Sequence, residues 1–308
     1  GYCEPVDVHI YRDSIQTQER HAMDLLIFKE GSALDVVLAR QAVEVVQLTV
    51  SIWSNKHDRI VIGELVRAIL QDEPMKMRRL ADIFHIDIAS INSMWIISGD
   101  TAEDREKLAD VLEPVLRDTR ACSEAAIADI YEGEMVLFMI GPGNIQDVRA
   151  LTEAIGNGLA GRGIRATLTR CHALNTTTRV REAFLSHQVA LPAAKRIFPG
   201  QWAYTLEQID FARQCQELIG RGERAVQEAL RCVAALQDGD GLLETLECYL
   251  LDARMHVTLT AEKMFLHKNT VKYRLQRIAD RLGFVPGELP ESMPLFTACA
   301  LGRLLRGN

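Results

Sequence analysis

Apolar residues near the C-terminus recur at helical spacing in two short segments joined by a turn. Within residues 268–282 the apolar side chains fall into one narrow stripe, at about 100° per residue. The members of this stripe are Val271, Leu275, Ile278 and Leu282. Upstream, Thr258 or Thr260 fits the cap of a shorter helix that runs through Met264, and residues 265–267 form the turn. The pattern predicts a helix-turn-helix whose second helix buries one face and leaves the other open.

The open face of that second helix has the chemistry of a DNA-reading surface. Asn269 and Arg277 project away from the stripe and can form bidentate hydrogen bonds with base edges. Lys268 and Lys272 are long cations that can reach phosphates on either side of a groove. The side chains that we expect to contact DNA are Thr260, His267, Lys268, Asn269, Thr270, Lys272, Tyr273, Arg274, Gln276 and Arg277. An ordinary amphipathic helix with a solvated basic face would show the same pattern.

A set of residues at fixed spacing runs through the turn and the second helix. Its members are Thr260, Ala261, His267, Asn269, Thr270, Val271, Tyr273, Arg274, Leu275, Ile278, Leu282 and Gly283. In residue type and spacing, the segment resembles the C-terminal helix-turn-helix of the PucR/CdaR family of bacterial transcription regulators. The resemblance implies a sequence-specific regulator that binds double-stranded DNA and responds to a small molecule. It also implies an effector site in the N-terminal or middle domain.

The resemblance extends to both sides of the helix-turn-helix, with two departures. Residues 242–250 match the leading helix of the family's domain, and residues 295–305 match its closing apolar helix. Met264 stands where the family usually has Leu, which is a volume-conserving exchange. Residues 254–256, Arg-Met-His, replace the usual Gly-Asn turn. We expect this second departure to lengthen the leading helix.

Composition places the chain among globular, cytoplasmic proteins. A chain of 308 residues with 48% hydrophobic residues can form two or three domains with substantial cores. Apolar runs such as Met135–Ile140 are too short to span a membrane, and no leader pattern opens the chain. The seven cysteines are scattered without a Cys-x-x-Cys pair, so we expect reduced thiols rather than disulfides or a zinc site.

The net charge of −7 is unexpected for a DNA-binding protein, because neutralisation of phosphates supplies most non-specific affinity. The charge is unevenly distributed. Residues 254–281 hold seven Lys or Arg against two Asp or Glu, whereas residues 202–252 hold four against ten. The basic charge is therefore local to the helix-turn-helix, and the acidic remainder limits non-specific contact with DNA.

The N-terminal part combines strand and helix patterns. Val6–Tyr11 and Asp24–Phe28 predict strands, and a pair of strands is not stable alone. We therefore expect residues 1–58 to be the C-terminal part of a larger sensor domain, followed by a helical linker over residues 59–92.

Helical spacing continues beyond these strands. Apolar residues three to four apart predict a long helix over 32–55, a second over 60–70 and a third over 75–84. The apolar positions of the long helix are Leu34, Val37, Leu38, Val45, Val46 and Trp53. They fit packing on the strands or pairing with a second copy. We expect a homodimer, because one helix-turn-helix reads too few bases alone.

Residues 93–220 alternate between strand and helix patterns in a βαββαβ order. Strands are expected at 94–97, 126–131, 134–140, 165–169 and 202–205, and helices at 102–118, 145–159 and 176–194. The order predicts a ferredoxin-like antiparallel sheet with helices on one face. The block resembles the degenerate GGDEF-like domain that PucR/CdaR regulators carry before their helix-turn-helix.

The middle domain lacks the pattern of a nucleotide cyclase. Cyclisation needs paired carboxylates that hold a metal ion and a loop whose glycines let the nucleotide approach. Asp100, Glu132 and Glu134 are better interpreted as capping and turn residues than as metal ligands. Residues 141–144, Gly-Pro-Gly-Asn, are better interpreted as a strand-to-helix turn than as a phosphate loop. We therefore expect no enzyme activity, no catalytic residue, no metal and no cofactor.

The sequence as a whole predicts a multidomain α+β protein. An N-terminal sensor remnant with a long helix precedes the GGDEF-like domain, and residues 221–308 form an all-α, PucR-type DNA-binding domain. We expect a DNA-binding transcriptional regulator that does not enter a membrane. Two alternatives are a nucleotide-binding or nucleotide-cyclising signalling enzyme, and a scaffold whose basic helix binds an acidic protein.

Overall fold

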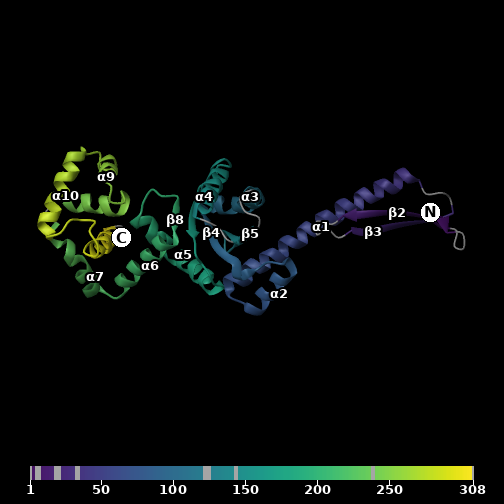
Figure 1. Cartoon of the computed structure of the whole chain (residues 1–308), viewed down its shortest axis with the longest axis horizontal. Coiled ribbons are helices and arrows are strands. Elements are labelled where there is room, and N and C mark those ends of the chain that lie inside the picture. The colour runs from purple at the N-terminus through teal and green to yellow at the C-terminus, as the bar shows by residue number, and fades with distance from the viewer. Residues whose placement is uncertain are drawn as a thin grey trace. The chain divides into compact units, whose positions relative to one another are not determined.

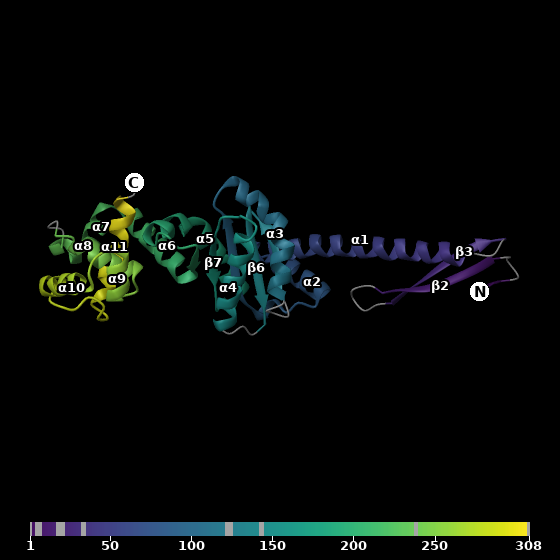
Figure 2. The same ribbon diagram turned by 90° about the horizontal axis from the view of Figure 1, so that it is seen from above.

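The structure is a computed structural model that describes residues 2–3, 8–16, 22–31, 35–120, 126–141, 145–236 and 240–306. The chain divides into two compact units, Gly1–Leu65 and Val66–Asn308. Figure 1 shows the ribbon with its elements labelled, and Figure 2 shows the same ribbon from above.

The first unit contains an antiparallel sheet and most of a long helix. The strands are β1 (Tyr2–Cys3), β2 (Val8–Gln16) and β3 (Ala22–Glu30). β2 and β3 pair in register from Val8–Glu30 to Gln16–Ala22. Both expected strands are confirmed where the structure describes them, and each is longer than the apolar pattern indicated.

The helix α1 (Val36–Gln71) runs without a break for 36 residues. The expectation of separate helices over 32–55 and 60–70 was therefore wrong. Residues 56–59, Lys-His-Asp-Arg, include neither glycine nor proline, so the polar residues there do not interrupt the backbone hydrogen bonds. The expected start at Ser32 lies outside the described residues. The division between the two units falls within α1, after Leu65.

The second unit begins with the end of α1 and continues through α2 (Pro74–Phe84), which matches the third expected helix. A mixed sheet follows. Its strands are β4 (Ile91–Gly99), β5 (Ala126–Tyr131), β6 (Glu134–Ile140), β7 (Ala166–Cys171) and β8 (Ala203–Thr205). The helices between them are α3 (Ala102–Arg120), α4 (Ile145–Ala160) and α5 (Thr177–Ile197).

The strand order β5-β6-β4-β7-β8 confirms the ferredoxin-like arrangement of the first four strands. β4 pairs antiparallel with β6 and β7, but β8 pairs parallel with β7. The expectation of an entirely antiparallel sheet was wrong at this edge. The helix α5 carries the chain back along the sheet, so β8 enters in the same direction as β7.

Helices cover both faces of this sheet, not one face as expected. On one face, the Trp95 indole of β4 donates a hydrogen bond to Thr152 of α4 at 2.9 Å. Ser98 lies on the opposite face, and its hydroxyl is 3.0 Å from Nε2 of His187 on α5. Since side chains alternate along a strand, α4 and α5 lie on opposite faces. Figures 1 and 2 show these helices around the blue-green strands.

The remaining helices form the C-terminal part of the second unit. They are α6 (Leu206–Gly220), α7 (Glu223–Leu230) with a 3-10 turn at Arg231–Leu236, α8 (Leu242–Glu247) with a π turn at Cys248–Asp252, α9 (Val257–Lys263), α10 (Lys268–Leu282) and α11 (Ser292–Arg306). One apolar core joins them to the second half of α5 and to Tyr204 of β8. Arg303 of α11 reinforces it with two hydrogen bonds to Asp252, at 2.8 and 2.5 Å.

Five of the cysteines are free thiols. Cys171, Cys215, Cys248 and Cys299 are buried, and Cys232 is half-buried. Burial raises the pKa of the Cys215 thiol to about 11, which keeps it protonated. No described helix is long and apolar enough to cross a membrane.

A buried polar cluster links the sheet to α5. The His187 side chain is 1% exposed, and its Nδ1 lies 2.8 Å from the Thr169 hydroxyl. Its Nε2 faces Ser98 and lies 4.0 Å from a carboxylate oxygen of Glu134. Burial, with a smaller contribution from the positive charge of Lys195, lowers the pKa of His187 to about 4.

The second unit should lose stability as the pH falls from about 6.5 to about 4. In this range the His187 imidazole binds a proton in the unfolded chain, whereas the buried imidazole of the folded chain stays neutral. The loss is on the order of 3 kcal/mol. Burial raises the pKa of Glu134, which works in the opposite direction. Urea titrations of the protein and of His187→Gln, followed by tryptophan fluorescence, measure the difference. Equal pH slopes for both proteins would contradict a neutral, buried His187.

Candidate nucleic-acid interface

The apolar stripe of α10 is buried as the sequence predicted. Val271 and Ile278 have no exposed side-chain area, and Leu275 and Leu282 are half-buried against the shared core. Packing therefore fixes which side of α10 faces the rest of the domain. α9 and α10 lie together at one end of the C-terminal helices (Figure 1).

The ends of α10 are defined by local hydrogen bonds and backbone geometry. His267 is the N-cap, and its Nδ1 accepts a hydrogen bond from the backbone N–H of Asn269 at 3.2 Å. Gly283 ends the helix with a left-handed φ of +83°, which glycine adopts without strain. His267, the last residue of the expected turn, therefore caps the helix.

The cap expected for α9 was wrong. The N-cap is His256, two residues before Thr258, and no side chain forms a capping hydrogen bond. Thr260 lies inside the helix, where its hydroxyl donates to the backbone oxygen of His256 at 2.9 Å. Its side chain has no exposed area. Thr260 is therefore a packing residue, and its buried side chain cannot contact DNA as expected.

The turn before α9 is formed without the glycine and asparagine of the family pattern. Arg254 and Met255 both adopt left-handed backbone angles, with φ of +49° and +61°. The N–H of Met255 donates to the backbone oxygen of Tyr249 at 2.8 Å, which closes the turn. We expected these residues to lengthen the leading helix, and this was wrong. Arg254 and Met255 adopt strained left-handed backbone angles, which are incompatible with a continuing right-handed helix.

The outward face of α10 displays polar and basic side chains. Tyr273 is 64% exposed. The other exposed side chains expected to contact DNA are His267, Lys268, Asn269, Thr270, Lys272 and Gln276. Gln276 donates to Asp280 at 2.9 Å, one turn further along the same helix. This face is solvent-accessible at the start and middle of α10, where a recognition helix meets base edges.

Arg274 and Arg277, by contrast, contact other parts of the domain. Arg274 donates to the Thr245 hydroxyl at 3.1 Å and to the backbone oxygen of Gly241 at 3.4 Å, which ties α10 to the start of α8. Arg277 forms an ion pair with Asp240 at 2.8 Å. The Arg277 guanidinium also lies 6.0 Å from the centre of the Tyr273 ring. Both arginines hold α10 and its side chains in place.

Sequence reasoning missed an exposed aromatic side chain in the turn between the two helices. Phe265 is 95% exposed and has a left-handed φ of +55°. It lies three residues before Lys268, the first residue of α10. Its place in the turn was predicted, but the apolar residue type gave no indication that the ring faces solvent.

Two of the candidate carboxylates of the middle domain, Asp100 and Glu132, accept hydrogen bonds within the protein. Asp100 accepts hydrogen bonds from Thr167 at 2.8 Å and Lys195 at 3.1 Å, and Glu132 accepts one from Gln188 at 2.6 Å. Among the described residues, no group of three or more His, Cys, Asp or Glu could hold a metal ion. Residues 142–144 of the possible phosphate loop lie outside the described residues.

Comparison with known families decides the identity of the C-terminal part. Residues 242–301 match the PucR C-terminal helix-turn-helix domain. They form a PucR-type DNA-binding domain. The resemblance seen in the sequence is confirmed over this range, which contains α8, α9 and α10. The GGDEF-like character of the middle domain lies outside it and stays a prediction, as does the absence of enzyme activity.

Three similar proteins match a short stretch of this chain. One uncharacterised protein of Mycobacterium bovis and two of Mycobacterium tuberculosis are 41% identical to it over 66 residues. The match covers 21% of this chain and 16% of each relative. The chain therefore matches only a small part of the length of these proteins.

A broader structural match extends beyond the PucR-type domain. The crystal structure of a regulator of polyketide synthase expression from Bifidobacterium adolescentis aligns with 79% of this chain and 93% of its own length. The sequence identity is 18% and the TM-score is 0.35.

Truncation of the buried stripe of α10 should destabilise the domain without changing its exposed surface. Ile278→Ala removes a fully buried side chain and should lower the free energy of unfolding by about 2–5 kcal/mol. Lys272→Ala, on the exposed face, should change it by less than about 0.5 kcal/mol. Chemical denaturation measures both. Similar effects of the two substitutions would contradict the orientation of α10.

Proposed function

We propose that the protein is a sequence-specific transcription regulator that binds double-stranded DNA through α10 and responds to a small molecule. The observation that carries this proposal is the exposed, basic face of α10 within a PucR-type domain. The buried stripe on the other side of the helix positions this face rigidly, as base reading requires.

The exposed side chains divide into two roles. Asn269 and Tyr273 project from the first half of α10, and we assign them to base edges. Lys268 and Lys272 flank them and we assign them to phosphates, together with the His267 cap. Thr270 and Gln276 also lie on the exposed face and complete the proposed interface.

Arg274 and Arg277 have a positioning role in this proposal. Arg274 fixes α10 to α8, and Arg277 holds the Tyr273 ring while it pairs with Asp240. Both guanidinium groups already bind groups within the domain. Removal of either side chain should therefore change the orientation of α10 more than the number of contacts between the protein and DNA phosphates. The bases are then read by Asn269 and Tyr273 from a fixed helix.

Asn269→Ala should weaken binding to a DNA duplex selected from a random pool by about 1–3 kcal/mol and should relax the base preference. Lys272→Ala should weaken binding to selected and scrambled duplexes alike and lower the salt dependence by about one charge. Lys107→Ala, in α3, removes the same charge outside the PucR-type domain. Fluorescence anisotropy at several salt concentrations separates these effects.

Two results would contradict the proposed interface. Unchanged base preference in a folded Asn269→Ala variant would exclude a reading role for this residue. Equal effects of Lys272→Ala and Lys107→Ala would show that the basic face of α10 does not meet phosphates. An interaction only with an acidic protein would appear as salt-sensitive binding that unrelated DNA does not compete.

We further propose that the regulator is a homodimer that pairs through its first unit. Several large apolar side chains of that unit are more than half exposed, which is unusual for a monomer. They are Phe28 at 61%, Val36 at 62%, Val37 at 65%, Leu38 at 63% and Val45 at 63%. Leu34, which the sequence also places among the apolar positions of the long helix, lies outside the described residues. Two copies would place two PucR-type domains on half-sites related by two-fold symmetry.

Val45→Glu should weaken dimerisation, because it introduces a charge into the exposed apolar stripe of α1. Gln41→Glu adds the same charge to an exposed polar position of the same helix and is the matched control. Sedimentation velocity at micromolar concentrations measures the mass of each protein. A monomeric parent protein, or a dimer that Val45→Glu leaves intact, would contradict pairing through this stripe.

A further inference from the structure

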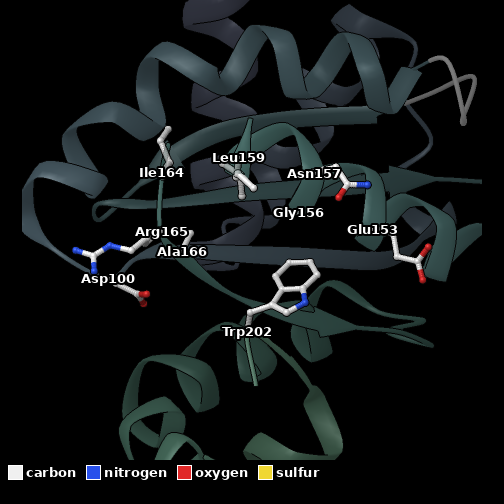
Figure 3. Close-up of a pocket in the computed structure, with 10 residues that line it drawn as sticks. Asp100, Glu153, Gly156, Asn157, Leu159, Ile164, Arg165, Ala166 and Trp202 are labelled. Carbon is white, nitrogen blue, oxygen red and sulfur yellow. The ribbon is translucent and has the colours of Figure 1, made fainter. Parts of the chain in front are cut away.

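The middle domain contains a cavity that the DNA-binding surface does not use. It has a volume of about 590 Å³ and opens between α4 and the segment before β8. This volume lies within the usual range of small-molecule sites, about 300–1,000 Å³. Leu159, Ile164 and Ala166 give it an apolar wall, and Trp202 closes the opposite side (Figure 3).

The Trp202 ring is held in place although it is 44% exposed. Its edge lies against Gly156 of α4, where an added Cβ would be only 2.5 Å from the indole Cη2. The backbone oxygen of Trp202 accepts a hydrogen bond from the N–H of Leu168 at 2.8 Å. A glycine at 156 therefore allows a large aromatic ring to stand beside α4 as a preformed wall of the cavity.

The charged groups at the cavity lie at two separate places. Arg165 and Asp100 stand together on one side of Trp202, and Glu153 stands on the other side (Figure 3). Asp100 is already neutralised by Lys195 at 3.1 Å. Arg165 is therefore the cation that stays accessible on its side of the cavity, and Glu153 is the accessible carboxylate on the other side.

Neither of these two side chains forms a hydrogen bond or an ion pair within the part of the chain that the structure describes. The exposed guanidinium of Arg165 is attracted by the negative charge of Asp104, but the hydrogen bond to Asp104 comes from the Arg165 backbone N–H, at 3.2 Å. Glu153 likewise has no hydrogen bond or ion pair among the described residues. Asn157, one turn after Glu153 on α4, adds an amide to the same rim.

We propose that this cavity binds a small amphoteric molecule with a planar apolar body between an anionic and a cationic group. The planar body stacks on the Trp202 indole, the anionic group pairs with Arg165, and the cationic group pairs with Glu153. A ligand of this class matches the apolar wall and both charges, whereas a molecule with one charge leaves the opposite residue unpaired.

The position of the cavity also connects it to the PucR-type domain. Trp202 directly precedes β8, and Thr205 at the end of β8 caps α6 through a hydrogen bond with the N–H of Gln208 at 3.3 Å. α6 belongs to the core that holds α10. The role of this cavity as the effector site rests on the proposed function of the protein. Binding of a ligand in the cavity is independent of that function.

Isothermal titration calorimetry of the full chain with 4-(aminomethyl)benzoate tests the binding site. Benzoate and benzylamine, which each keep one of the two charges, should bind at least about tenfold more weakly, because charge-assisted hydrogen bonds contribute about 1.5–3 kcal/mol each. Arg165→Ala should abolish the advantage of the full probe over benzylamine. Glu153→Gln should abolish its advantage over benzoate.

Gly156→Ala tests the cavity wall, because its methyl group would displace the Trp202 ring. Gly220→Ala is the matched control, since a Cβ at this position meets nothing within 4 Å. We expect probe binding to be lost in the first variant and retained in the second, with both folded by circular dichroism. No heat of binding for any of the three molecules, or equal affinity for all three, would overturn the proposal.

The regulatory role needs a separate measurement, in which the affinity for the selected duplex is compared with and without the probe. A change in DNA affinity that Arg165→Ala removes would support the cavity as the effector site. Probe binding without any effect on DNA affinity would overturn that role but leave the binding site intact. Failure to bind DNA at all would contradict the proposed function without affecting the calorimetric result.

Discussion

The arrangement of the C-terminal helices in the second unit depends on one continuous apolar core. It begins in the second half of α5, passes Tyr204 of β8 and ends among α8, α10 and α11. Because Ile278 is buried in this core, α10 cannot turn about its axis without exposing apolar surface to water. The core thus fixes the direction of the exposed polar face of α10 and also joins the PucR-type domain to the sheet that carries the cavity.

Much of this fold follows from the alternation of apolar and polar residues. The residues of β5 and β6 were predicted without error, because a two-residue turn separates two short apolar runs. The parallel direction of β8 and the place of α5 on the second face were not predicted. Both depend on how a long helix crosses the sheet, which the period of its own residues does not specify. The unbroken α1 was missed because polar residues alone do not end a helix.

The candidate interface shows the same division between local and distant information. Helical periodicity identified the exposed Asn269 and Tyr273, since the buried stripe determines the opposite face. The partners of Arg274 and Arg277 lie about 30 residues or more upstream. Helical spacing predicts only contacts three or four residues apart, so it could not predict these long-range contacts. Thr260 follows the family pattern but is buried, which shows that a recurrent residue can serve packing rather than DNA contact.

A crystal structure of the protein bound to a duplex selected from random DNA would test most directly whether the exposed face of α10 reads base sequence. We expect α10 in the major groove, with Asn269 and Tyr273 at base edges, Lys268 and Lys272 at phosphates, and Arg277 still paired with Asp240. A complex in which α10 lies outside the groove, or in which Val271 and Ile278 face the DNA, would contradict it.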